Sequence, residues 1–495
     1  MPDQIPAPAI DYTVILQLLI VFGWATLLLL VDLFVPRERS RISGYVALVG
    51  VAVAAAAGIP FWRADGSSVA TFNNMIALDN YGLALNWIFL LTAAITIVIS
   101  LEYLGRQGIE RAEYYSLILF ATGGMMLLAQ GTDLIVLFLG LETLSITLYV
   151  LAGFAYPRLS SEEAAMKYLL IGAFAAGFLV FGIALLYGAT GTSSLVGIAQ
   201  KLGSGLAADD VAFMLAGAAL VIIGFGYKIS MAPFHMWTPD VYEGSPTPVA
   251  AFMSVGTKGA GFAALARLLL VALGSQYATW AVILAILAAI TMLIGNISAV
   301  AQTNVKRMLA YSSIGHAGYI LMGVLAAGGA AGASRGVEGF LFYLLAYSLT
   351  NLGAFAVLIA LEQRGEAAWD MGDFAGLWHR QPFLAVAMAL CMFSLAGVPP
   401  TAGFWGKFYV FAAAWEAGLQ WLAIVGVITS AIAAFFYLRI IVQMFMRDPV
   451  RDVRPVLDRN LAIGVGLAAL GVIVFGIIPT PVIDLVQSSV LALGR

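Results

Sequence analysis

The sequence is a succession of apolar stretches of about 20 residues separated by short polar loops. A helix of about 20 residues crosses the roughly 30 Å hydrocarbon core of a bilayer and satisfies its own backbone hydrogen bonds. The chain is also 62% hydrophobic and only 10% charged, whereas soluble globular proteins are about 25% charged. These features predict an all-α polytopic membrane protein, with residues 1–495 forming one membrane domain.

The length rule predicts fourteen membrane-spanning helices along the chain. They are expected at 12–35, 43–62, 80–101, 113–130, 133–155, 166–188, 211–232, 248–273, 277–300, 305–327, 336–361, 383–418, 421–446 and 459–480.

The seventh and twelfth spans are expected to be broken helices. The seventh runs into a segment with Pro233 and Pro239, and the twelfth contains Pro399 and Pro400. Proline removes a backbone donor and clashes with the preceding turn. The two breaks lie five spans apart, so these helices run in opposite directions. This predicts two inverted five-helix repeats, 113–273 and 277–446.

Lys and Arg are distributed unevenly between alternate loops and helix ends. One side carries only Arg63, Lys201, Arg335 and Arg495, whereas most of the other basic residues fall on the opposite side. The positive side faces the cytoplasm in membrane proteins. We therefore expect both chain termini on the non-cytoplasmic side of a bacterial plasma (inner) membrane.

Four ionisable side chains lie deep inside predicted spans, namely Glu142, Lys228, Lys258 and Lys407. A charge near the bilayer centre costs several kcal/mol unless it is paired or hydrated, and intramembrane charges mark ion pathways. At a rise of 1.5 Å per residue, Glu142, Lys258, His316 and Lys407 come near the membrane midplane. Lys228 and Lys407 both lie on the outer side of their helix breaks. Placement at one depth favours a row of charges lying in the plane of the membrane.

This row predicts proton transfer, with Glu142 and Lys228 as the switch. Burial favours the neutral form of a lysine and a nearby carboxylate favours the charged form, so a changing distance between the two would bind and release a proton. Lys258 would then receive that proton through water. The alternative for any single lysine is a static ion pair, or a bond to carbonyls freed by a broken helix.

His316 follows Ser312 by one helical turn, and the two share a face of their helix. Histidine titrates near neutral pH, so His316 is a candidate relay between Lys258 and Lys407. A histidine that is merely hydrogen-bonded between helices fits the sequence as well.

The sequence predicts no cofactor and no metal on this chain. Cys391 is the only cysteine, which excludes an internal disulfide and a cysteine-ligated cluster held by this chain alone. A phosphate-binding loop and a Gly-rich dinucleotide fingerprint are both absent from the sequence. The sequence has no cluster of basic residues that would indicate nucleic-acid binding.

Three segments resemble the antiporter-like membrane subunits of bacterial NADH-quinone oxidoreductase, or respiratory complex I. Residues 224–248 read GFGYKISMAPFHMWTPDVYEGSPTP, residues 304–316 read NVKRMLAYSSIGH, and residues 397–408 read GVPPTAGFWGKF. The last two are similar to the N branch of that family. The sister branches L and M differ around the twelfth-span break, and M carries glutamate at the position of Lys407.

The resemblance implies a fold of fourteen helices with two inverted five-helix repeats. It also implies a proton path through Glu142, Lys228, Lys258, His316 and Lys407, coupled to quinone reduction in other subunits. Flavin, iron-sulfur clusters and the quinone site would lie in those other subunits. The expected partners are other membrane subunits of the complex, including the antiporter-like subunit M and small membrane subunits, together with the lipid bilayer.

Two further functions fit the residues. A subunit of an Mrp-type cation/proton antiporter would carry similar lysines, although the segment 397–408 favours the first function. A purely structural membrane subunit would bind its neighbours and move no ion, but packing alone does not require deep charges.

Overall fold

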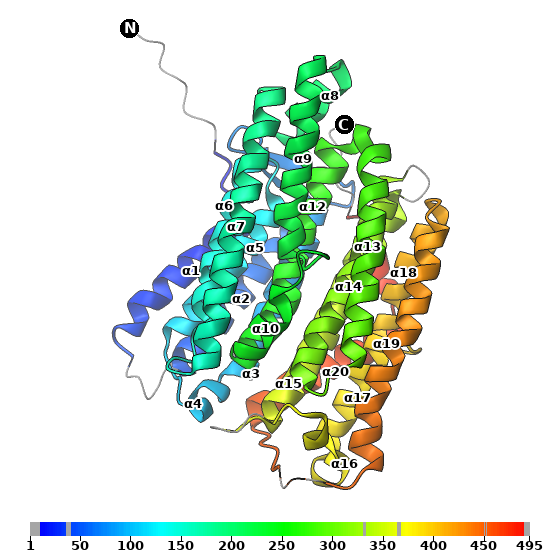
Figure 1. The fold of residues 1–495 in the computed structure, drawn as a ribbon. Coiled ribbons are helices and arrows are strands. Elements are labelled where there is room, and N and C mark those ends of the chain that lie inside the picture. Colours follow the sequence, from blue (N-terminus) through cyan, green and yellow to red (C-terminus); the bar gives the residue numbers. More distant parts are fainter. Residues whose placement is uncertain are drawn as a thin grey trace.

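The computed structural model describes residues 10–35, 41–329, 333–363, 368–449, 451 and 453–489. These ranges fold into helices that run side by side, with one small antiparallel sheet of β1 (Val69–Thr71) and β2 (Ile76–Leu78) (Figure 1). A helix, or a run of consecutive helical segments, lies in or across every range predicted to span the membrane. Of the described helices, 11 are long and apolar enough to cross a membrane, which makes this a multi-pass membrane protein.

The helices of the first half of the chain are α1 (Leu16–Asp32), α2 (Arg41–Gly58), α3 (Asn80–Ser100), α4 (Tyr103–Gln107), α5 (Glu113–Gln130), α6 (Leu134–Ala152), α7 (Leu159–Thr190), α8 (Leu195–Ser204), α9 (Ala208–Lys228), α10 (Trp237–Gly244), α11 (Thr247–Phe252) and α12 (Lys258–Arg267). Two π-helical turns, η3 (Met253–Thr257) and η4 (Leu268–Ala272), flank α12.

The helices of the second half are α13 (Tyr277–Val300), α14 (Val305–Gly328), α15 (Ala333–Leu361), α16 (Leu377–Arg380), α17 (Pro382–Ala396), α18 (Ala402–Glu416), α19 (Gln420–Met446), α20 (Arg459–Ile477) and α21 (Thr480–Gln487). Short 3-10 turns occupy Ile59–Phe61, Gly274–Gln276 and Met371–Phe374. Figure 1 shows α4 and α16 at one end of the molecule and α8 at the other, as the predicted alternation of loops requires.

Both predicted helix breaks are present. The seventh span divides into α9 and α10, and the twelfth divides into α17 and α18. At the second break, Gly397 adopts a left-handed backbone with φ 85°, a conformation that glycine enters without a steric penalty. The chain therefore leaves α17 abruptly, and the last carbonyls of that helix are free to accept hydrogen bonds from a side chain.

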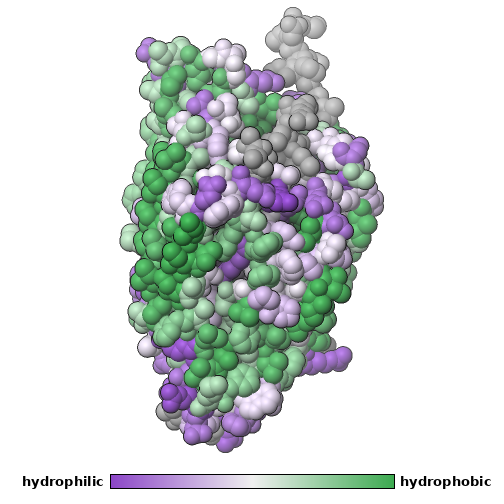
Figure 2. Space-filling model, turned by 90° about the vertical axis from the view of Figure 1, so that its right-hand side faces the viewer, coloured by the Kyte–Doolittle hydropathy of each residue, from purple (hydrophilic) through white to green (hydrophobic). Residues whose placement is uncertain are grey.

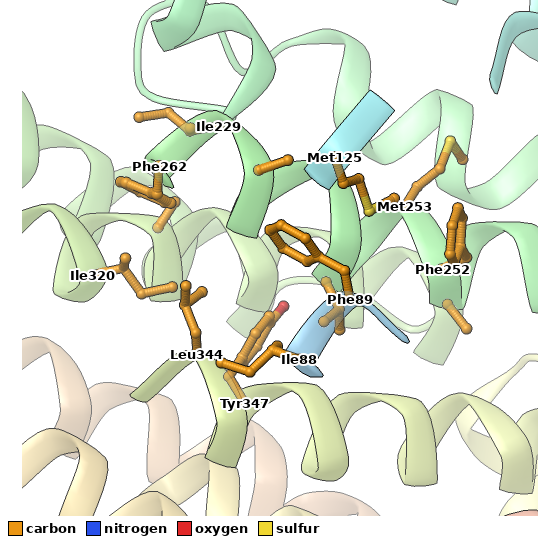
Figure 3. Packing of buried hydrophobic residues seen from close by; sticks show 14 of the residues in the cluster. Ile88, Phe89, Met125, Ile229, Phe252, Met253, Phe262, Ile320, Leu344 and Tyr347 are labelled. Carbon is orange, nitrogen blue, oxygen red and sulfur yellow. The ribbon is translucent and has the colours of Figure 1, made fainter. Parts of the chain in front are cut away.

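The surface and the interior match a bilayer environment. Figure 2 shows hydrophobic residues along the flanks of one face and hydrophilic residues gathered at its lower end and in a belt above the middle. The exposed large side chains of α13 are apolar and include Val282, Ile283 and Ile286. Large apolar side chains also fill the centre, where α3, α5, α12, α14 and α15 meet (Figure 3).

A buried ion pair joins three helices at the end of the molecule that carries α8. Arg267 at the end of α12 donates two hydrogen bonds of 2.8 Å to the carboxylate of Asp79, and a third of 2.8 Å to the main-chain oxygen of Ala129 in α5. Asp79 also caps α3 by accepting from the amide of Gly82. Both charged side chains are fully buried, so this contact fixes the relative position of α3, α5 and α12.

Close packing at the second break predicts that Gly403→Ala destabilises the protein. A Cβ at this position would clash with the main-chain oxygen of Ser394, so α18 must move away from α17. Such overpacking costs about 1–3 kcal/mol. We expect a lower thermal unfolding temperature in detergent. Gly177→Ala in α7 is the matched control, because a Cβ there meets nothing within 4 Å; equal effects of the two variants would contradict the prediction.

Candidate functional site

Lys228 is the last residue of α9 and is fully buried beside the first helix break. Its Nζ donates hydrogen bonds of 2.9 Å to Ser145 Oγ in α6 and 3.0 Å to Tyr168 Oη in α7. The ion pairs among the described residues do not include one between Lys228 and Glu142. Hydroxyl groups therefore bind this ammonium in the present conformation.

Glu142 lies on a half-exposed face of α6, one turn before Ser145. Its neighbours on that face, Leu139 and Ile146, are 53% and 58% exposed. One carboxylate oxygen of Glu142 is buried with no hydrogen-bond partner in the described residues. A carboxylate at this depth is costly against lipid, so the face of α6 that carries Glu142 needs a polar or charged neighbour.

Lys258 begins α12 and is also fully buried. Its Nζ donates to the hydroxyl of Ser313 in α14, and the same hydroxyl accepts a hydrogen bond of 2.8 Å from Tyr347 Oη in α15. The ring of Tyr242 lies on the other side, with its centroid 6.0 Å from Nζ. Three helices from both halves of the chain thus enclose Lys258.

His316 lies on α14 between two tyrosines. Nδ1 is 2.7 Å from Tyr343 Oη and Nε2 is 3.0 Å from Tyr437 Oη, and the imidazole stacks on the ring of Tyr347. Tyr347 also donates to Ser313, so Lys258 and His316 are connected through two hydrogen bonds and one ring contact. The hydrogen bonds between helices that one interpretation predicts for His316 are present. The position of His316 after Lys258 in the predicted row also fits the other interpretation, a proton relay.

Lys407 lies on α18 after the second break. Its Nζ donates to the main-chain oxygens of Leu395 and Ala396, at 2.8 and 3.1 Å, and to Ser430 Oγ at 2.7 Å. The predicted alternative of a lysine bound to carbonyls freed by a broken helix therefore describes the contacts of Lys407. A small cavity of about 10 Å³ lies between Lys407 and His316, and a larger one of about 270 Å³ opens on the other side of the lysine.

The three lysines share one arrangement, a serine acceptor together with an aromatic ring. The rings of Tyr168, Tyr242 and Tyr319 lie 5.1, 6.0 and 5.2 Å from the respective Nζ atoms. A hydroxyl can accept from an ammonium and donate to a neutral amine, whereas a carbonyl can only accept. The hydroxyl contacts of Lys228 and Lys258 therefore suit both protonation states, and the three acceptors around Lys407 suit its ammonium.

Sequence reasoning missed a second buried group at the end of the molecule that carries α4 and α16. Lys306 is one of the basic residues that the charge count places in loops and at helix ends. It lies at the start of α14 but is fully buried, and Glu362, just beyond the end of α15, is equally buried. Glu362 accepts hydrogen bonds from Tyr103 and Thr247. The one sequence signal was the position of Lys306 at the very start of an apolar stretch.

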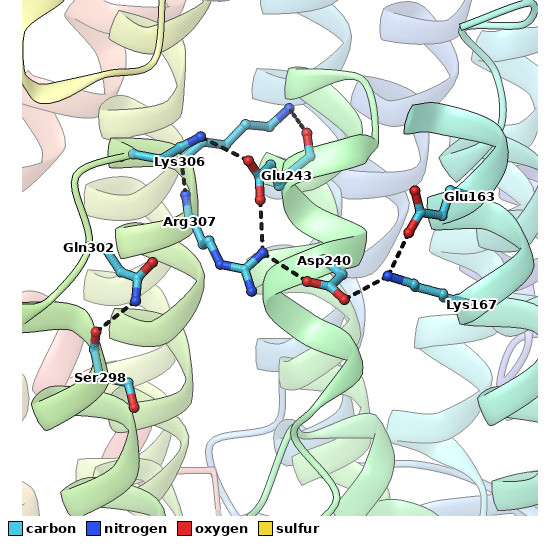
Figure 4. Close-up of polar contacts among 9 residues, drawn as sticks. Glu163, Lys167, Asp240, Glu243, Ser298, Gln302, Lys306 and Arg307 are labelled. Carbon is cyan, nitrogen blue, oxygen red and sulfur yellow. Dashed lines mark hydrogen bonds and ion pairs between the residues drawn. The ribbon is translucent and has the colours of Figure 1, made fainter. Parts of the chain in front are cut away.

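Charged residues around Lys306 link α7, α10 and α14 (Figure 4). Arg307 pairs with both Asp240 and Glu243 of α10, at 2.8 Å in each case. Asp240 pairs in turn with Lys167 of α7 at 2.9 Å. These contacts extend from the first half of the chain to the second, outside the row formed by the predicted site residues.

Comparison with known proteins gives one family match over most of the chain. Residues 131–433 match the family described as NADH:quinone oxidoreductase/Mrp antiporter, TM. The chain is also 65% identical over 491 residues to NADH-quinone oxidoreductase subunit N 2 of Roseiflexus castenholzii, covering 99% of this chain and 98% of that protein.

Solved structures share the fold. A chain of respiratory complex I from Thermus thermophilus is 34% identical, with a TM-score of 0.79 over 94% of this chain and 98% of that one. A chain of the Mrp complex from Dietzia sp. has a TM-score of 0.82 over 96% of this chain and 97% of that one, at 22% identity. The fold is thus common to both kinds of complex, whereas the sequence is nearer to the first.

Proposed function

This chain belongs to the family of subunit N of NADH-quinone oxidoreductases, and on that premise we propose that it is an antiporter-like membrane subunit that moves protons, driven by quinone reduction elsewhere in the complex. The likeness to relatives over nearly the whole chain supports this function. The predicted alternative, an Mrp-type antiporter subunit, has weaker support, because the similar Mrp chain is only 22% identical.

The proposed proton path runs from Glu142 through Lys228, Lys258 and His316 to Lys407. The observation that supports this path is that each of the three buried lysines donates a hydrogen bond to a serine hydroxyl rather than to a carboxylate. Hydroxyls accept from an ammonium and donate to an amine, so Lys228 and Lys258 can change protonation state without losing their hydrogen bonds. A lysine held only for stability would gain more from a carboxylate partner.

The proposed topology has fourteen spans, with inverted repeats at 113–273 and 277–446 and both termini on the non-cytoplasmic side of a bacterial inner membrane. The paired breaks at α9–α10 and α17–α18 support the repeats. In this orientation α4 and α16 face the cytoplasm, and α8 faces the opposite side.

The proposed partners are the other membrane subunits of the complex. The half-exposed carboxylate of Glu142 supports a small membrane subunit against α6, and the cavity beside Lys407 supports a contact with subunit M at the opposite end of the row. We assign flavin, iron-sulfur clusters and the quinone site to other subunits, and no cofactor or metal to this chain.

Purification through a tag on this chain, in mild detergent, tests the proposed function. We expect redox subunits to copurify with this chain. The purified complex should reduce quinone, with NADH as the electron donor. Reconstituted vesicles should then acidify on adding NADH, and a sodium gradient alone should drive no proton movement. Copurification with only other antiporter-like subunits, together with sodium-driven proton movement, would instead identify an Mrp-type complex.

A further inference from the structure

The buried ammonium of Lys306 is the centre of a contact between α14 and the end of α10. Nζ donates hydrogen bonds of 3.1 and 2.7 Å to the main-chain oxygens of Glu243 and Ser245. These carbonyls lie at and just beyond the C-terminus of α10, where a helix leaves acceptors without internal partners. A lysine is well suited to this position, because its positive charge also complements the helix dipole.

Side chains on both sides reinforce this contact, as Figure 4 shows for Arg307 and the two carboxylates. Arg307 binds Asp240 and Glu243, and Asn304 Nδ2 donates to the other oxygen of Glu243 at 3.0 Å. We call this set of contacts, made by Asn304, Lys306 and Arg307 with residues 240–245, the α10 latch.

Residues of the α10 latch line a polar cavity. The cavity has a volume of about 250 Å³ and is lined by charged side chains that include Arg158, Lys167 and Asp240. Trp369 also lines it, and the ring of Trp369 lies 4.1 Å from Lys306 Nζ. On the inner side of the latch, Tyr242 is fully buried with its ring facing Lys258.

Tyr242 immediately precedes Glu243, whose carbonyl Lys306 holds. Movement of the end of α10 away from α14 would therefore carry Tyr242 with it. The space between the cavity and Lys258 would open, and water could reach a lysine that is otherwise enclosed by protein.

We propose that Lys306 is a positioning residue that holds the α10 latch closed and thereby controls the access of water from the 250 Å³ cavity to Lys258. Its link to proton movement rests on the proposed function. The position of α10 itself does not, so the two can be tested separately.

The test places a reporter cysteine at Ser245, a buried hydroxyl of similar size to a thiol, in a chain whose native Cys391 is replaced by Ala. An impermeant maleimide is added to inside-out vesicles that contain the assembled complex. We expect slow labelling with the latch intact, and a rate about fivefold higher in Lys306→Met, because two hydrogen bonds to the end of α10 are lost. Lys201→Met, at an exposed site on α8, should leave the rate unchanged.

A second variant covers the case in which Lys306→Met fails to assemble. Asn304→Asp keeps the cap that Asn304 provides for α14, since Asp is an equally good N-cap. It also places a carboxylate against that of Glu243, and the repulsion should raise the labelling rate by about twofold to threefold. The proposal would be overturned if both variants were labelled as slowly as the parent. If Lys306→Met cannot be measured, slow labelling of Asn304→Asp alone would overturn it.

Lys306→Arg distinguishes positioning from proton transfer. Arginine keeps the charge and the donors but does not release a proton, so slow labelling and proton uptake per NADH should both be retained. Lys306→Met should lower that uptake while raising the labelling rate. Slow labelling combined with lost proton uptake in Lys306→Arg would mean that Lys306 carries protons itself, and would refute its positioning role.

Discussion

Replacing Lys228 by Met is expected to abolish proton translocation through this chain while leaving the complex assembled. Methionine fills the buried site with a side chain of similar length, but it cannot hold a proton or bond Ser145 and Tyr168. Loss of a proton-transfer group slows transfer by roughly 100-fold or more. The measurement is the number of protons taken up per NADH oxidised in inside-out vesicles, with assembly followed on a native gel.

Lys228→Arg separates the proton relay from a static charge. Arginine stays protonated. If the charge of Lys228 merely stabilises the fold, proton uptake should survive this substitution, whereas it should be lost if Lys228 must release its proton. We expect the Arg variant to assemble and to be as deficient in proton uptake as the Met variant. A normal uptake ratio in Lys228→Met would exclude Lys228 from the path, and Lys201→Met serves as the control for substitution of an exposed lysine.

The second large effect is expected at the buried pair of Asp79 and Arg267. In Asp79→Ala, the guanidinium keeps its bond to Ala129 but loses both carboxylate contacts. Removing one partner of a buried ion pair costs about 3–5 kcal/mol, because the other charge stays buried and uncompensated. We expect a marked loss of assembled complex and a lower unfolding temperature of what remains.

The control for this prediction is an exposed pair. Arg335 and Glu416 are 59% and 38% exposed, and removing such a contact changes stability by about 0–1 kcal/mol. Arg335→Ala should therefore have little effect on assembly. A double variant, Asp79→Leu with Arg267→Met, should recover most of the loss, since apolar residues of similar volume replace buried pairs with little cost. Equal losses in Asp79→Ala and Arg335→Ala would contradict the assigned role.

The sequence predicted the helices well because a bilayer imposes a strong and simple constraint. A span needs about 20 apolar residues, so the limits of α13 and α14 fall within one residue of those expected. Proline chemistry identified both breaks, since a missing donor and a steric clash act locally. The deep charges were visible for the same reason, because hydrocarbon makes each of them costly wherever the helices pack.

The partners of those charges could not be predicted, because they come from distant parts of the chain. Lys228 and its acceptor Ser145 are separated by 83 positions, and Arg267 and Asp79 by 188. Spacing within a helix carries no information on such contacts. The burial of Lys306 could not be predicted for a related reason: a basic residue at a helix end normally reaches solvent or headgroups, but here the packing of α10 and Trp369 covers it.

The sequence by itself thus determined the class of fold, the two broken helices and the residues whose charge lies within the membrane, because each follows from the local cost of exposing polar groups to lipid. The tertiary structure alone decided that the three lysines bind serine hydroxyls, that Glu142 lies on a half-exposed face, and that Lys306 holds the end of α10. Those features depend on which helices pack together, and that choice is made by the complementary shapes and hydrogen bonds of residues far apart in the chain.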